Sequence, residues 1–181
     1  PGARRLAQVA AVVGREFPVA VAEAVAGSAD AEGDIASLLR AEIVREVRRF
    51  PELECTFRHG LLQEAALSTL TPTAQRELYG RIGHAMEAHL GDQADERLEQ
   101  MAFYFYRSDD TETALSYLDR AAEHAMSVEA LGRAGELWSR ARKLAERMGD
   151  EDLAGRIDQQ LSRLRKRSSG ELPLPPIEPD G

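Results

Sequence analysis

The chain of 181 residues has a single cysteine, Cys55, and no apolar run that approaches the roughly 20 residues needed to span a bilayer. One cysteine excludes an intrachain disulfide and fits a reducing compartment. The N-terminus does not have the composition of a signal peptide, and the chain begins at Pro1 rather than at Met. We therefore expect a piece of a longer cytoplasmic protein that does not use a membrane.

The sequence also lacks the G-x-x-x-x-G-K-[ST] phosphate loop, so a nucleotide site of that class is not contained in the chain. His84, Glu87 and His89 invite a metal hypothesis. The two histidines are five residues apart, about 140° around a helix, whereas ligands on one helix face need a spacing of three or four. No nucleophile or polarising partner stands near His59 in the sequence. We expect no catalytic residue, no cofactor and no metal.

The chain has a net charge of −8, and the excess lies in its middle, where residues 61–128 carry 12 acidic and five basic side chains. Phosphate groups require a basic footprint. This distribution argues against broad contact with nucleic acid or with an anionic membrane.

The most informative stretch runs from residue 53 to residue 70. Leu53, Cys55 and Phe57 alternate with polar residues, which predicts a half-buried strand with Cys55 inside and Thr56 and Arg58 outside. From Leu61 the apolar residues take helical spacing. A strand therefore runs into a helix, and two architectures meet here.

Before this junction the sequence predicts three short helices and a β-hairpin. Asp30 suits the N-cap of the third helix, and Pro51 places the hairpin turn at residues 50–52 because proline cannot donate a ladder hydrogen bond. Three short helices followed by a hairpin is the layout of a winged helix. We assign it to residues 1–60.

After the junction the sequence predicts a mainly α array of antiparallel helical hairpins over residues 61–167. The pattern Ala114-x3-Leu118-x2-Ala121 recurs with Trp138 as its large residue, between Ala134 and Ala141. Small and large residues so spaced are typical of tetratricopeptide helix pairs. We expect Trp138 to be buried against the helix that holds the first copy. Residues 168–181, with four prolines, are predicted to be a disordered tail or linker.

Two motifs resemble one known family, the large bacterial signal-transduction ATPases that join a P-loop ATPase to a winged helix and tetratricopeptide-like helices. The first motif is the segment from Leu6 to Phe17, LAQVAAVVGREF. The second is Phe57-Arg58-His59 together with residues further along the chain that match the family's junction motif without a gap: Leu62, Gln63, Glu64, Leu70, Arg76, Leu78 and Ile82. Leu67 and Tyr79 depart from the family pattern but keep bulk. The resemblance covers roughly residues 4–148.

The resemblance implies a non-catalytic segment that relays signals from an ATPase domain upstream of Pro1 to helical repeats that bind a protein or a small molecule. In such a parent the effector is a cyclase, kinase or transcription-factor domain. At the junction we predict an interdomain contact made by Arg58, His59, Gln63 and Glu64, the last two in the first turn of the helix. An internal strut is the alternative role for Arg58.

Two other functions remain open. A free-standing repeat scaffold is one, and a DNA-binding winged-helix regulator is the other. The third helix, which would read the duplex, carries Asp30, Glu32, Asp34 and Glu42 against Arg40 alone. Such a helix repels phosphates, although Arg45, Arg48 and Arg49 give the wing some basic surface. DNA is thus the weaker hypothesis.

Overall fold

The computed structural model describes residues 1–169. The chain forms two compact units, Pro1–Asp110 and the part from Thr111 onward. The first unit contains α1 (Gly2–Val13), β1 (Glu16–Pro18), α2 (Val19–Ala26), α3 (Ala31–Arg40), β2 (Val44–Arg48), β3 (Glu54–Phe57), α4 (Gly60–Ser68), α5 (Pro72–Leu90), the 3-10 helix η1 (Gly91–Arg97) and α6 (Leu98–Tyr106). The second contains α7 (Thr111–Ser127), α8 (Leu131–Met148) and α9 (Glu151–Ser168).

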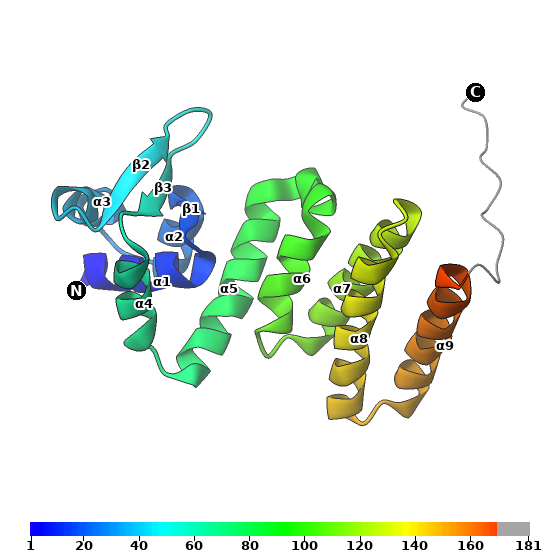
Figure 1. The fold of residues 1–181 in the computed structure, drawn as a ribbon. Helices are drawn as coiled ribbons and strands as arrows, with labels where there is room; N and C mark the ends of the chain where they lie inside the picture. The colour runs from blue at the N-terminus through cyan, green and yellow to red at the C-terminus, as the bar shows by residue number, and fades with distance from the viewer. Residues whose placement is uncertain (170–181) are drawn as a thin grey trace. The chain divides into compact units, whose positions relative to one another are not determined.

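The fold is mainly α with one small antiparallel sheet, as the sequence predicts. In the first unit α1 is the central element, because it packs against α2, α3, α4, α5 and β1 (Figure 1). Its buried side chains cover most of its circumference: Leu6, Ala7, Val9, Ala10, Ala11, Val12 and Val13. A helix buried on so many sides belongs to a core rather than to a surface.

The sheet has the order β1-β3-β2, so β3 lies between two partners. The expected hairpin of β2 and β3 is present, and it projects from the helices of its unit with the turn at Pro51 (Figure 1). The strand β1 was not predicted. Its pairing with β3 changes the environment of Thr56, which is 2% exposed rather than facing outward. The Thr56 hydroxyl donates to the carbonyl of Arg15 at 3.0 Å, which makes the burial of a polar side chain tolerable.

Cys55 is fully buried in β3, as predicted, and contacts no solvent. Burial in this apolar setting raises the pKa of the Cys55 thiol to about 11, and the nearby carboxylate of Glu46 adds to the increase. The thiol is therefore protonated and unreactive at neutral pH. Cys55 is a small hydrophobic core residue.

The first compact unit extends to Asp110, whereas the sequence predicts a domain boundary at residue 60. The physical reason is that α5 packs on α1 and α2. The Tyr104 hydroxyl of α6 also donates to the carbonyl of Val13 at 3.0 Å. Gly83 of α5 lets α6 approach closely, because a Cβ at this position would lie 2.8 Å from the ring of Phe105. The helices α5 and α6 thus share a core with α1.

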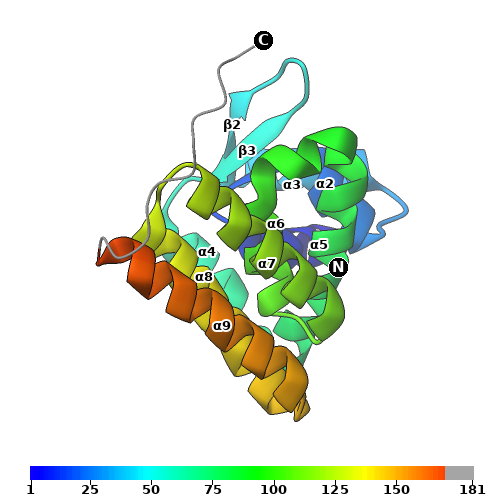
Figure 2. The ribbon, with the colours of Figure 1, turned by 90° about the vertical axis from the view of Figure 1, so that its right-hand side faces the viewer.

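The second unit is a row of three helices in which α8 packs against both α7 and α9 (Figures 1 and 2). The alanines of the repeated pattern are buried between α7 and α8, and Trp138 is 2% exposed. The Trp138 indole N–H donates to Asp119 of α7 at 2.9 Å. The predicted packing of Trp138 is confirmed. The predicted tail begins where α9 ends at Ser168, and its residues 170–181 lie outside the described part of the chain.

Replacing Trp138 tests this packing. We expect Trp138→Ala to lower the free energy of unfolding by about 3–5 kcal/mol, since it leaves a large cavity between α7 and α8. Trp138→Phe keeps most of the ring and loses the bond to Asp119, so a loss of about 1–2 kcal/mol is expected. Urea titration followed by far-UV circular dichroism measures both values, because the chain has no second tryptophan to report by fluorescence. An unchanged midpoint and slope for Trp138→Ala would contradict the packing.

Candidate functional site

The predicted contact residues lie where β3 ends and α4 begins, and the structure gives Arg58 a partner within the same unit. Its guanidinium lies 2.9 Å from the carboxylate of Glu42, and its backbone N–H donates to the carbonyl of Ile43 at 3.0 Å. Glu42 stands in the turn between α3 and β2. The two side chains are 44% and 69% exposed, and a pair so accessible to water contributes at most about 1 kcal/mol. Arg58 thus links the end of β3 to the turn that holds Glu42, and its side chain is still accessible to a partner in solution.

His59 and Glu64 are exposed and face solvent in this unit. His59 is the N-cap residue of α4, but its side chain makes no capping hydrogen bond. Glu64 is the fifth residue of α4, so the expectation that it lies in the first turn is wrong, and the first turn contains no acidic residue. The helix dipole acts on charges within its terminal turn. Glu64 therefore contributes surface charge rather than a dipole interaction.

Gln63 differs from its three companions because it points inward. Its amide nitrogen donates to the carbonyl of Ala11 in α1 at 3.0 Å. Ala11 lies in the last turn of α1, where carbonyl groups have no partner within the helix. The side chain of Gln63 is half-buried and so supplies a cap for a neighbouring helix. Gln63 attaches α4 to the core of the unit.

The outer face of α4 exposes apolar side chains, which was not predicted from the sequence. We define this outer face by Leu61, Glu64, Ala65 and Ser68, which follow the i, i+3, i+4, i+7 spacing of one helix side and are all exposed. Leu61 is 77% exposed, and α4 has no fully buried residue although more than half of its side chains are apolar. Apolar residues all around a helix are typical of a buried one. The apolar composition of α4 was available in the sequence, and the structure shows that part of this apolar surface stays uncovered within the unit.

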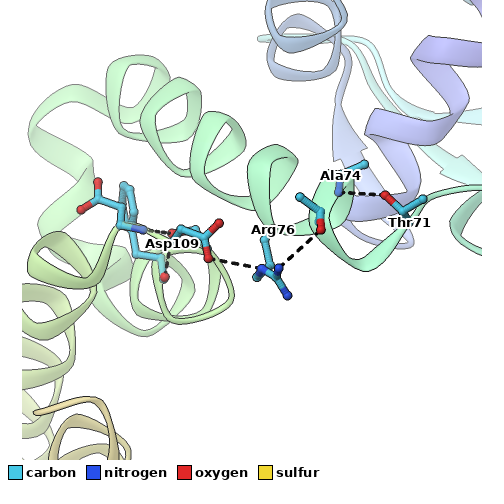
Figure 3. A network of polar contacts seen from close by, with 8 residues as sticks. Thr71, Ala74, Arg76 and Asp109 are labelled. Carbon is cyan, nitrogen blue, oxygen red and sulfur yellow. Dashed lines mark hydrogen bonds and ion pairs between the residues drawn. The ribbon is translucent and has the colours of Figure 1, made fainter. Parts of the chain in front are cut away.

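The helix that follows α4 is anchored separately. The Thr71 hydroxyl accepts from the N–H of Ala74, so Thr71 is the N-cap of α5 (Figure 3). Arg76, one of the motif residues, lies 3.2 Å from the carboxylate of Asp109. This ion pair joins the start of α5 to the loop after α6, as Figure 3 shows. Arg76 therefore has a structural role within the first unit.

The two histidines of the metal hypothesis face different carboxylates. His89 lies 2.7 Å from Glu52 of the hairpin turn, whereas His84 lies 3.2 Å from Asp110 and 3.5 Å from Glu87. Over residues 1–169, no group of three or more histidine, cysteine or acidic side chains has the arrangement of a metal site. No helix in the same range is long and apolar enough to cross a bilayer.

The second unit has a groove of about 320 Å³ between α7 and α9, with Ala141 of α8 at its floor. Apolar side chains from both outer helices line it, and polar groups stand among them. The lining residues are Leu115, Ser116, Asp119, Leu153, Arg156, Ile157 and Gln160. Asp119 is held by its bond to Trp138. A mixed lining of this kind suits a peptide or a small organic ligand.

On the face of the first unit that would meet DNA, α3 exposes an acidic side chain, and arginines of the hairpin form ion pairs with glutamates of the same hairpin. On α3 Glu32 is exposed, and the Asp30 side chain caps the helix by accepting from Gly33. In the hairpin Arg48 pairs with Glu54, and Arg49 lies 2.6 Å from Glu46. Carboxylates already offset two of the three wing arginines. This arrangement weakens the electrostatic attraction that duplex binding requires.

Comparison of the chain with protein-family models, with curated proteins and with solved structures gave no match.

Gln63 and Glu64 make a matched pair for testing the attachment of α4. We expect Gln63→Ala to lower the free energy of unfolding by about 1–3 kcal/mol, because it leaves a carbonyl of α1 without a donor. Glu64→Ala should change it by less than about 0.5 kcal/mol, as for other exposed positions. Chemical denaturation measures both. Equal effects of the two substitutions would refute the assignment of Gln63 as the cap of α1.

Proposed function

We propose that the chain is a non-catalytic regulatory segment of a multidomain signalling ATPase. In this proposal an NTPase domain upstream in the same protein docks on the outer face of α4, next to Arg58 and His59. The observation that carries the proposal is the 77% exposure of Leu61 on an apolar helix without a buried residue. The resemblance of the residues around Phe57 to the junction motif of such ATPases supports the identity of the partner.

The relay rests on how α4 is held. One side of α4 is bonded to α1 through Gln63, and α1 packs directly on α5. A partner that shifts α4 would change the hydrogen bond at Ala11 and so act on the core of the unit. The second unit supplies the other end of the relay, since its groove between α7 and α9 has the size and lining to receive a peptide or small molecule.

The observations favour this protein-contact function over DNA binding. A duplex-binding surface would need free basic side chains, but Arg48 and Arg49 are paired with glutamates and the third helix exposes Glu32. The outer face of α4 combines one carboxylate with apolar side chains, which suits a protein surface better than a phosphate backbone.

Substitution of Leu61 in the longer protein that carries the NTPase domain tests the proposal. Leu61→Glu places a charge at the centre of the docking surface and should weaken docking by about 1–2 kcal/mol. We expect a several-fold change in the rate of nucleotide hydrolysis. In the chain described here the same substitution should change stability by less than about 0.5 kcal/mol, because the position is exposed.

Val128→Glu is the matched control, since Val128 is 60% exposed but lies outside α4, directly after α7. It should leave hydrolysis unchanged. A hydrolysis rate that is the same for wild type and Leu61→Glu would contradict the proposal. So would an equal effect of the two substitutions.

A further inference from the structure

The second unit contains another groove, between α8 and α9, that the proposed function does not use. It has a volume of about 510 Å³ and shares no lining residue with the groove between α7 and α9. On its floor Leu161 is buried and Leu164 is half-buried. Gly135 of α8 allows Leu164 to come close, because a Cβ at this glycine would lie 3.1 Å from the leucine side chain. The groove therefore has a short apolar floor made by two leucines one turn apart on α9.

Two exposed basic side chains stand at this groove, Lys143 on α8 and Arg165 on α9. Within residues 1–169 neither of them forms an ion pair with a carboxylate. The one acidic residue in the lining, Glu136, lies 2.7 Å from Arg133, which offsets its charge. The groove thus offers two positive charges to a ligand.

The helix pairing sets the spacing of these charges. Only two residues join α8 to α9, and the two helices run antiparallel (Figure 1). Leu164 lies beside Gly135, so its neighbour Arg165 stands at that end of the groove. Lys143 is eight residues further along α8, or roughly 12 Å at 1.5 Å per residue. Leu161 lies one turn from Leu164 in the direction of Lys143. The apolar floor therefore lies between the two basic side chains.

An extended peptide matches this spacing. Alternate side chains of an extended chain point to the same side, and residues four apart are separated by roughly 13 Å. A segment with acidic residues at its first and fifth positions and an apolar residue at its third thus places two carboxylates at the basic side chains and one apolar group over the leucines. The phosphates of a nucleic-acid strand follow one another at much shorter spacing and would leave the apolar floor uncovered.

We propose that the groove between α8 and α9 binds an extended segment of a partner protein with the pattern acidic-x-apolar-x-acidic. One carboxylate pairs with Arg165 and the other with Lys143, while the apolar side chain contacts Leu161 and Leu164. Apolar contact at the centre and polar contact at the edges is the usual anatomy of a protein interface. The site does not depend on the proposed function, since it is separate from the outer face of α4 and from the groove between α7 and α9.

A titration of the ¹⁵N-labelled chain with a synthetic peptide, followed by NMR, tests the proposal. The peptide GESLSEG with blocked ends is the probe. We expect a dissociation constant below about 1 mM, modest because a flexible peptide loses entropy when it binds. The amide shifts should change around Gly135 to Lys143 and Leu161 to Arg165. The peptides GQSLSQG, without the charges, and GESSSEG, without the apolar residue, should each bind at least about fivefold more weakly.

Two double variants with the same change in net charge separate the groove from general charge attraction. Lys143→Glu with Arg165→Glu should weaken binding of GESLSEG at least about tenfold. Arg163→Glu with Lys166→Glu, at exposed positions of α9 outside the lining, should leave it within about twofold of wild type. The amide spectra verify that both variants are folded.

Three results would overturn the proposal. One is the absence of groove shifts with the peptide at about 5 mM, well above the expected dissociation constant. Another is an equal loss of affinity in the two double variants. The third is tighter binding of an oligothymidylate of about eight nucleotides at the same amides, because the groove would then be a site for nucleic acid.

Discussion

The C-terminal end of α1 imposes the constraint on which the first unit depends. The last carbonyl groups of a helix have no partner within it, and here they are buried at the centre of the unit. The Gly14 N–H donates to Ala10 at 3.1 Å, the Gln63 side chain donates to Ala11, and the Tyr104 hydroxyl donates to Val13. The last two donors come from α4 and α6, far along the chain. Burial of the Tyr104 phenol raises its pKa, so the hydroxyl keeps its proton for this bond.

This arrangement gives α4 two different sides. The inner side is joined to α1 through Gln63, and the outer face, centred on Leu61, has no cover within the unit. The helix α4 is therefore attached to the core and still has exposed apolar surface, as a docking site has. In the proposed function a partner bound to this surface moves α4, and the movement reaches α1 through Gln63. Arg58 adds to this by bonding the adjacent turn at Glu42 while staying accessible. The proposed regulatory contact uses both properties.

Local signals in the sequence predicted much of the fold. The period-2 alternation correctly predicted that Cys55 is buried, and the spacing of the alanines correctly predicted that Trp138 is buried. The short strand β1 gave no periodic signal over three residues, and its pairing with β3 is what buries Thr56. At the candidate site the position of Gln63 could be predicted but its partner could not, because Ala11 is 52 residues away in the chain. The exposure of Leu61 likewise depends on which tertiary contacts are absent around α4.

Native-state hydrogen exchange tests most directly whether residues 1–110 form one cooperative unit held together at the end of α1. The account predicts that the most protected amides of α1, α5 and α6 exchange with one shared opening free energy. Tyr104→Phe, which removes the donor to Val13, should lower that free energy equally in all three helices. If protection falls in α6 alone while α1 keeps its full value, α6 is a separate cooperative unit and the account is wrong.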